Sequence, residues 1–290
     1  MAEDVFEQYR PLLLGLGYRL LGSMWDAEDV VQEAYLRWMR TDTEEIREPR
    51  AFLVTVVSRL ALDQLRSARV TREAYAGPWL PEPVSAEGLG PLDTAELRDT
   101  LSYATLHLME RLTPPERAVF VLREAFELPY DDIAEIVGSP AATCRQLHSR
   151  AAKRLRGTGA RENRHFRPTS QDHAALLARF LTAAQDGDLA ALTDLLAEDV
   201  VAWNDGGGKV RAARRPIVGR AKVLAFIAGL MERYPHDEVG LIEVNGEPAA
   251  RTVMGGLHQV VTLDIRDGRI HAIFGILNPD KLTHVSGVQR

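Results

Sequence analysis

The chain has 290 residues, 46% of them hydrophobic, with 35 Lys and Arg against 41 Asp and Glu and a formal net charge of −6. No apolar run reaches the roughly 18 residues of a membrane span, and the start MAEDVFEQYR has neither the basic nor the apolar part of a secretory signal. Cys144 is the single cysteine, which excludes an internal disulfide. These features predict a cytoplasmic protein without membrane contact.

An acidic helix is predicted over DAEDVVQEAYLRWMR, residues 26–40. Asp26 suits the N-cap, and the acids of the first turn match the helix dipole. The spacing of Val30, Val31, Ala34 and Trp38 indicates a core face. The outer face then carries Asp29, Gln32 and Glu33.

The next helix combines a core face with an arginine-rich face. In IREPRAFLVTVVSRLALDQLRSARVTR, residues 46–72, the core positions are Phe52, Leu53, Val56, Val57, Leu60 and Leu65. From Arg47 to Arg72 there are six Arg against two acids. Taken alone, the two helices also suit an ordinary bundle with mixed surface charge.

Residues 76–96 are predicted to be an interdomain linker, because the segment is dense in Pro and Gly. It contains WLPEP, in which a Trp and a Leu stand between prolines. Such apolar side chains have nothing to bury against in a solvated tether, so we expect a docking segment. It consists of Trp79, Leu80, Pro81, Glu82 and Pro83, with Trp79 interpreted as a packing residue.

Residues 113–156 indicate a helix-turn-helix. The pair Thr113–Glu116 is a capping box with Pro at the first helical position. Asp131–Asp132 place negative charge at the start of a short helix, and Gly138 supplies the turn after it. Ser139–Pro140 then open the last helix as N-cap and first helical residue.

The last helix has an apolar face of Cys144, Leu147, Ala151 and Leu155, which makes Cys144 a packing residue and not a redox sensor. From residue 139 to residue 167 there are eight Lys and Arg against one acid. A solvated amphipathic helix is the alternative, but the capped start and the glycine turn favour DNA binding in the major groove. The predicted DNA contacts on it are Ser139, Thr143, Arg145, Gln146, Ser149, Arg150, Lys153 and Arg154.

Net charge does not reveal this function, since it is −4 up to residue 170 and −2 after it. The positive charge is concentrated in two patches, and it is these patches that meet phosphates. We expect weak DNA binding by the chain alone.

From residue 171 the pattern changes to an α+β domain. Two helices separated by Asp186–Asp188 are followed by a strand near 200–203 and a helix around 221–233. Strands around 239–244, 249–254, 257–265 and 269–277 complete an antiparallel sheet, with Asp267–Gly268 as a hairpin turn.

Residues 1–160 resemble the extracytoplasmic-function group of bacterial sigma factors, on DAEDVVQEAY, PRAFLVTVVSRLALDQLR and the helix-turn-helix. The resemblance implies that the helix-turn-helix reads the −35 promoter element. It implies that the acidic helix binds core RNA polymerase through Asp26, Asp29, Gln32 and Glu33. The arginine-rich segment would open and read the −10 element through Arg59, Arg66, Arg69 and Arg72. The recognition helix has Ala142–Gln146 as ATCRQ where the group usually has Gly-Thr-Val and Lys-Ser, so the resemblance does not give the −35 sequence.

The C-terminal domain resembles the SnoaL-like families of the NTF2-like superfamily, in which a curved sheet wraps around helices. With WLPEP, the motifs DGGGK and NPDKL resemble a subgroup of these sigma factors that has a fused SnoaL-like extension acting as a regulator in cis. The fold implied is multidomain: two all-α sigma domains (residues 1–75 and 97–158), a basic tether (159–170) and an α+β cone (171–290). The implied regulatory residues beyond WLPEP are Asp205, Gly206, Gly207, Gly208, Lys209, Asn278, Pro279, Asp280, Lys281 and Leu282. Three glycines would let backbone approach the linker.

Two alternatives come from other function classes. One is a helix-turn-helix repressor with a ligand-binding effector domain, which leaves DAEDVVQEAY and WLPEP unexplained. The other is an isomerase-type enzyme that uses Asp205, His258 or His271 as acid or base. No paired catalytic residues are evident, so we predict no catalytic residue, metal or cofactor. A small ligand in the C-terminal pocket is a further candidate partner.

Overall fold

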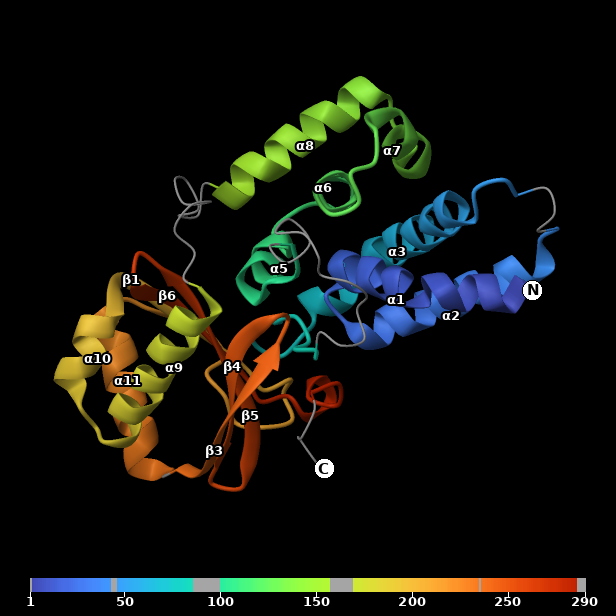
Figure 1. The fold of residues 1–290 in the computed structure, drawn as a ribbon. Helices are drawn as coiled ribbons and strands as arrows, with labels where there is room; N and C mark the ends of the chain where they lie inside the picture. The colour runs from blue at the N-terminus through green and yellow to red at the C-terminus, as the bar shows by residue number, and fades with distance from the viewer. Residues whose placement is uncertain (1, 43–45, 86–99, 157–168, 235, 286–290) are drawn as a thin grey trace. The chain divides into compact units, whose positions relative to one another are not determined.

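The computed structural model describes residues 2–42, 46–85, 100–156, 169–234 and 236–285, and for residues 68–73, 156, 236 and 237 the backbone alone. The chain forms two compact units (Figure 1). The first comprises residues 1–73 and 86–161, and the second comprises residues 74–85 and 162–290. The segment that contains WLPEP therefore belongs to the same unit as the C-terminal domain.

The first unit is helical in the part that the structure describes. Its helices are α1 (Ala2–Leu21), α2 (Met24–Arg40), α3 (Pro49–Glu73), α5 (Tyr103–Met109), α6 (Pro114–Glu124), α7 (Tyr130–Val137) and α8 (Ala141–Arg156). The predicted N-cap of the acidic helix is wrong by three residues. The Ser23 hydroxyl accepts a hydrogen bond from the N–H of Asp26, so α2 begins at Met24 and Asp26 lies in its first turn.

The helix-turn-helix follows the predicted boundaries closely. The capping box is confirmed, because the N–H and the hydroxyl of Thr113 both donate to Glu116 Oε2. Gly138 ends α7 in the left-handed conformation, with φ of 71°. α8 begins at Ala141, one residue later than predicted, because Pro140 is the residue whose carbonyl accepts the first helical bond, from Cys144.

Two buried arginines join the helices of the first unit. The Arg19 guanidinium donates to the Thr100 hydroxyl and to the carbonyl of Gly15. Arg117 donates to the carbonyl of Arg19 and pairs with Glu110. Burial lowers the pKa of Arg19 to about 10, so its side chain is still charged at neutral pH. α1 is thereby tied both to the start of the α5 region and to α6.

The second unit is an α+β domain built on one six-stranded sheet. Its elements are α9 (Ser170–Gln185), α10 (Leu189–Leu195), β1 (Leu196–Asp205), β2 (Ile217–Val218), α11 (Arg220–Arg233), β3 (His236–Val244), β4 (Glu247–Met254), β5 (Leu257–Arg266), β6 (Arg269–Ile276) and the 3₁₀ turn η3 (Pro279–Lys281). The strand order is β2-β1-β6-β5-β4-β3. The prediction of an antiparallel sheet is wrong for one pair, since β1 and β6 run parallel, and β2 was not predicted.

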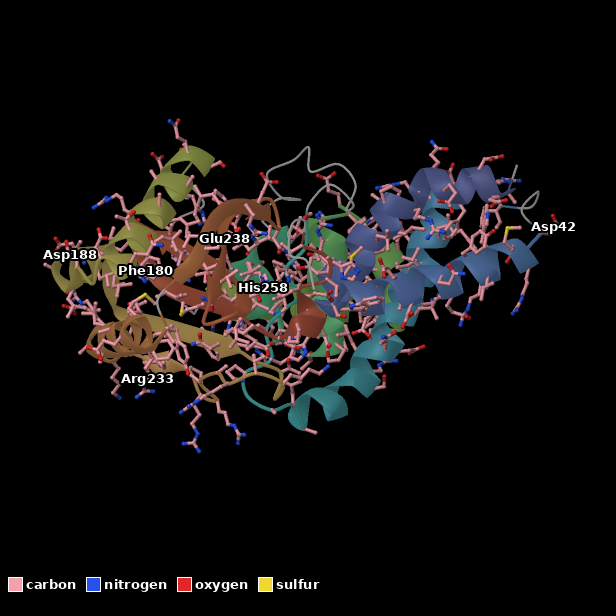
Figure 2. All side chains as sticks on the ribbon, turned by 90° about the horizontal axis from the view of Figure 1, so that it is seen from below. Asp42, Phe180, Asp188, Arg233, Glu238 and His258 are labelled. Atoms are coloured by element: carbon pink, nitrogen blue, oxygen red, sulfur yellow. The ribbon has the colours of Figure 1, made fainter. Side chains whose placement is uncertain are left out.

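The helices α9, α10 and α11 lie against one face of this sheet (Figure 1). Their apolar side chains form the domain core with the sheet, and Phe180 of α9 (labelled in Figure 2) is one of them. The predicted hairpin between β5 and β6 is confirmed, with positive φ at both Asp267 and Gly268. None of the helices in the described residues is both long and apolar enough to cross a membrane.

Candidate functional site

The outer face of α2 is partly apolar. Asp29, Gln32 and Glu33 are exposed, as predicted. The same face carries three large exposed hydrophobic side chains at helical spacing, namely Trp25 (51% exposed), Leu36 (40%) and Met39 (47%). These three were missed, although the period of 25, 29, 32, 36 and 39 marks one helix face. A helix face with exposed apolar groups between acids is typical of a protein-binding surface.

Asp26 differs from its predicted companions. Its Oδ1 accepts a hydrogen bond of 2.8 Å from Gln64 Nε2 of α3, and its side chain is half-buried. Asp26 therefore connects α2 to α3 in this structure.

The arginines of α3 have partners within the first unit. Arg59 donates to the carbonyl of Glu135 near the end of α7, at 2.9 Å, and Arg66 pairs with Asp63 at 3.1 Å. The side chains of Arg69 and Arg72 lie outside the described residues. The contact of Arg59 shows that α3 and α7 lie side by side in the first unit.

The predicted DNA-reading face of α8 is largely solvent-exposed. Its exposed side chains are Arg145, Gln146, Ser149, Arg150, Lys153 and Arg154, whereas Ser139 and Thr143 are half-buried. Arg154 differs from the others because it pairs with the capping-box residue Glu116 at 2.5 Å. The Arg145 guanidinium lies 5.3 Å from the ring centroid of Tyr130, which holds it at the start of the exposed face.

A histidine joins the three helices of the helix-turn-helix. His148 of α8 contacts the Tyr130 hydroxyl through Nδ1 at 3.2 Å and Glu124 through Nε2 at 2.8 Å. Its ring also stacks on Phe120 at 6.0 Å. The sequence pattern did not single out His148, because its partners belong to α6 and α7.

The second unit contains a buried ionic cluster at the linker. The Asp205 side chain has no exposed surface and accepts four hydrogen bonds. The four donors are the Tyr75 hydroxyl (2.7 Å), the N–H of Gly207 (2.9 Å), the N–H of Leu80 (3.0 Å) and Lys281 Nζ (2.7 Å). Lys281 Nζ also donates to the carbonyl of Leu80 at 2.5 Å. Both backbone groups of Leu80 are therefore bound by one buried ion pair.

Aromatic rings of the linker enclose the same ammonium group. Lys281 Nζ lies 4.1 Å from the ring centroid of Trp79 and 4.8 Å from that of Tyr75. Asn278 Nδ2 donates to the Tyr75 hydroxyl at 2.8 Å. Burial, and after it the hydrogen bond to Asp205, raises the pKa of Tyr75 above its usual value, so the phenol stays neutral and remains a donor.

The glycine motif allows close backbone approach on two sides. A Cβ on Gly208, where φ is 71°, would come within 2.9 Å of the Ala76 Cβ, and one on Gly207 would overlap the Asn278 carboxamide. Lys209 pairs with Asp280 at 2.6 Å on the surface. WLPEP, DGGGK and NPDKL, far apart in the chain, thus meet at one place.

The rest of the linker segment is held as well. Glu82 is buried and contacts His284 Nδ1 at 2.5 Å. The N–H of Ser85 donates to the carbonyl of His284, and Val84 exchanges two hydrogen bonds with Asn245. We call residues 74–85, held by Asp205, Lys281, Asn245 and His284, the linker clamp.

This geometry does not suit Asp205 as a general base. A carboxylate has about four lone-pair sites, and all four are taken by donors of the protein. His271 contacts Asp199 at 3.5 Å, and His258 has no acidic partner among the described residues. The described part of the chain also has no cluster of His, Cys, Asp and Glu that would hold a metal ion.

Three family models match the chain. They are Sigma-70 region 2 over residues 5–71, Sigma-70, region 4 over residues 103–155, and the SnoaL-like domain over residues 177–273. Their order agrees with helical regions followed by an α+β domain.

Similar proteins extend over the full chain. Over 296 residues, the chain is 40% identical to the ECF RNA polymerase sigma factor SigJ of Mycobacterium tuberculosis, covering 98% of this chain and 94% of the relative. It is 33% identical over 279 residues to a probable ECF RNA polymerase sigma factor, SigI, of the same species, covering 94% and 92%. The crystal structure of the SigJ protein matches with a TM-score of 0.77 and 37% identity, over 98% of this chain and 99% of that one.

Proposed function

The chain belongs to the extracytoplasmic-function (ECF) family of RNA polymerase sigma factors, and we propose that its C-terminal domain regulates it in cis through the linker clamp. As a sigma factor it directs core RNA polymerase to promoter DNA. It is a transcription initiation factor and not a repressor, and the family matches give no support to the enzyme alternative.

One observation carries the proposal of regulation in cis. The ion pair between Asp205 and Lys281 binds the N–H and the C=O of Leu80 at once, and the Asp205 side chain has no exposed surface. The linker is thereby held by backbone bonds, which fix the path of the chain itself. A domain that only touched side chains of the linker would leave that path free.

The clamp acts on the connection between the two DNA-reading regions. Region 2 ends with α3 at Glu73, and the match to region 4 begins at residue 103. The 12 residues from Ala74 to Ser85 correspond to up to about 40 Å of contour length. While they are held on the C-terminal domain, they cannot lengthen the connection. The clamp would therefore limit how far apart the −10 and −35 readers can lie.

The first unit has separate surfaces for its two partners, core RNA polymerase and promoter DNA. We propose that core polymerase binds the α2 face formed by Trp25, Asp29, Gln32, Glu33, Leu36 and Met39, which combines exposed apolar and acidic groups. The exposed side of α8 would read the −35 element, and α3 would contribute to the opening and reading of the −10 element. Because Arg59 is bonded to Glu135, its use on DNA requires α3 and α7 to separate.

A transcription assay with spacing variants tests the clamp. Run-off transcription with core polymerase compares the full chain with Lys281→Met, on promoters whose −10 to −35 distance is lengthened by one or two base pairs, about 3.4 to 7 Å. We expect Lys281→Met to use the longer promoters better relative to the optimal one, because its linker is released. Lys209→Met removes only an exposed ion pair and is the matched control.

Amide hydrogen exchange at residues 76–85 shows whether the clamp opens. Faster exchange in Lys281→Met together with an unchanged spacing profile would contradict regulation through the linker. A small ligand of the C-terminal domain would act on the clamp only if its affinity differs between the held and the released linker.

A further inference from the structure

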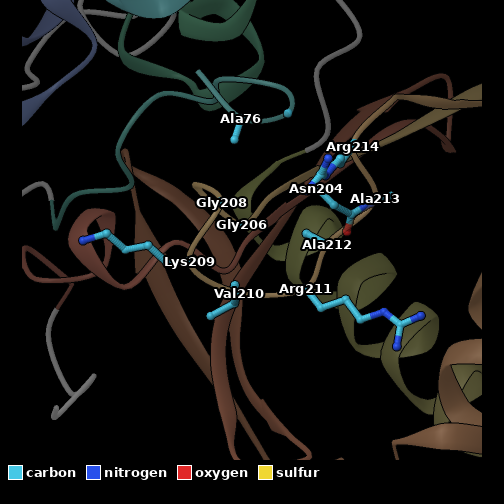
Figure 3. Close-up of a pocket in the computed structure, with 11 residues that line it drawn as sticks. Ala76, Asn204, Gly206, Gly208, Lys209, Val210, Arg211, Ala212, Ala213 and Arg214 are labelled. Carbon is cyan, nitrogen blue, oxygen red and sulfur yellow. The ribbon is translucent and has the colours of Figure 1, made fainter. Parts of the chain in front are cut away.

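A cavity of about 320 Å³ lies beside the linker clamp, within the second unit (Figure 3). One wall is the linker, at Ala76 and Gly77, and the other is the chain from Asn204 to Arg214, after the end of β1. The volume is at the lower end of the range of small-molecule pockets, about 300–1,000 Å³. The cavity is thus large enough for a compact metabolite.

Asn204 lines this cavity, and its carboxamide holds an unsatisfied donor just below the cavity surface. Successive side chains of a strand point to opposite faces, so Asp205 turns to the clamp while Asn204 lies over Gly275 of the neighbouring strand β6. Gly275 makes room for it, since a Cβ there would come within 2.9 Å of Asn204 Oδ1. Within the described residues, the buried Asn204 Nδ2 has no acceptor. Native proteins rarely leave such a group unpaired, which points to an acceptor from outside the chain.

The charged groups of the lining are all basic. They are Lys209, Arg211 and Arg214, and the lining contains no acid. Lys209 is paired with Asp280, and in Figure 3 the side chains of Lys209 and Arg211 extend to opposite sides, away from Asn204. Arg214 lies on the same side of the cavity as Asn204, and it has no acidic partner in the part of the chain that the structure describes. An anion is therefore favoured here, and a metal cation is not.

We propose that this cavity binds a small organic acid. Its carboxylate would pair with Arg214, whose planar fork matches two carboxylate oxygens, and a further oxygen of the ligand would accept from Asn204 Nδ2 once the carboxamide turns toward the cavity. The binding does not depend on the regulatory role of the clamp. The linker passes close to Arg214, since a Cβ on Gly77 would lie only 3.8 Å from the Arg214 Cα. A ligand bound to Arg214 would therefore also touch the linker. A bound acid therefore stabilises the held linker.

Saturation-transfer NMR on the full chain tests the site. The probe is 4-oxopentanoate, which has a carboxylate and a ketone oxygen on a short apolar chain, and its methyl ester is the uncharged control. A molecule of this size is expected to bind with a Kd of about 1 mM. Arg214→Gln should weaken binding about tenfold, and Asn204→Asp should abolish it by placing a carboxylate against the ligand. Arg215→Gln, an exposed neighbour outside the lining, should leave the Kd unchanged.

Hydrogen exchange of residues 76–80 should slow on addition of the probe to the unmodified chain. The proposal is refuted by the absence of saturable binding up to about ten times the expected Kd, by equal binding of the ester, or by equal losses in Arg214→Gln and Arg215→Gln. Displacement of the probe by inorganic phosphate at equal concentration would assign the site to simple oxyanions and also refute it. An unchanged promoter-spacing profile in Lys281→Met would overturn the clamp mechanism and leave these binding results intact.

Discussion

Replacing Lys281 by Met tests how strongly the clamp is held. Met keeps most of the apolar stem but removes the ammonium from beside Asp205, whose side chain has no exposed surface. Breaking a buried ion pair from one side costs about 3–5 kcal/mol, because the remaining charge stays buried without its partner. Loss of the cation from the rings of Trp79 and Tyr75 adds about 1 kcal/mol. The three remaining donors to Asp205 offset part of this, so we expect a loss of about 3–4 kcal/mol.

The assay must resolve the second unit from the first, because the two need not unfold together. Hydrogen exchange of β1 and β6 amides under increasing urea measures the stability of the second unit directly. Asp205→Asn combined with Lys281→Met completes a double-mutant cycle, in which we expect the second substitution to recover about 2 kcal/mol. Lys209→Met, which breaks a pair that is 53% and 59% exposed, should cost less than about 1 kcal/mol. If Lys281→Met loses no more stability than the Lys209→Met control, the reasoning is refuted.

Three further substitutions probe the same architecture. Tyr75→Phe removes one of the four hydrogen bonds to buried Asp205 and the acceptor of Asn278 Nδ2, and it should cost about 1–3 kcal/mol at neutral pH. Because the folded pKa of Tyr75 is raised, its contribution is complete below its unfolded pKa of about 10 and is lost as the pH rises beyond it, so alkaline denaturation profiles of the two proteins should converge. Gly208→Ala should destabilise the second unit by about 1–2 kcal/mol more than Gly256→Ala, which has a similar φ but open space around an added Cβ; equal losses in thermal denaturation would contradict the contact with the linker. Leu36→Lys should weaken binding to core polymerase by about 1–2 kcal/mol and leave the stability within about 0.5 kcal/mol, and unchanged affinity in a fluorescence titration would exclude this α2 face.

Much of the fold was predictable because its signals are local. The capping box at Thr113, the turn at Gly138 and the Asp267–Gly268 hairpin each depend on a few adjacent residues. The strand β2 has only two residues, too few for any periodicity. The parallel pairing of β1 with β6 depends on where the chain returns after α11 and three further strands, which no local pattern records.

The candidate site was predictable only in part. The resemblance to one subgroup of sigma factors brought WLPEP, DGGGK and NPDKL together as regulatory motifs. The three glycines indicated a close approach of the backbone to the linker. Residue types did not reveal that Asp205 and Lys281 pair, because 76 positions separate them in the sequence. Tyr75 was assigned to the region 2 domain by its position, and its hydroxyl instead bonds with Asp205. A buried cluster takes its members from distant segments, so it becomes visible only when those segments are folded together.

Several of the arginines predicted to bind DNA are paired within the first unit. Counting arginines predicted two positive patches, but a count cannot say which of the arginines are available to phosphates. Arg59 is bonded to the carbonyl of Glu135, Arg66 to Asp63, and Arg154 to Glu116. Each of these bonds must be exchanged for a phosphate contact, so it reduces the net gain from binding DNA. If binding of core polymerase to α2 also separates α3 from α7, Arg59 becomes available to DNA. The weak DNA binding that we expect of the free chain would then have two causes, the internal pairing of its arginines and its net charge.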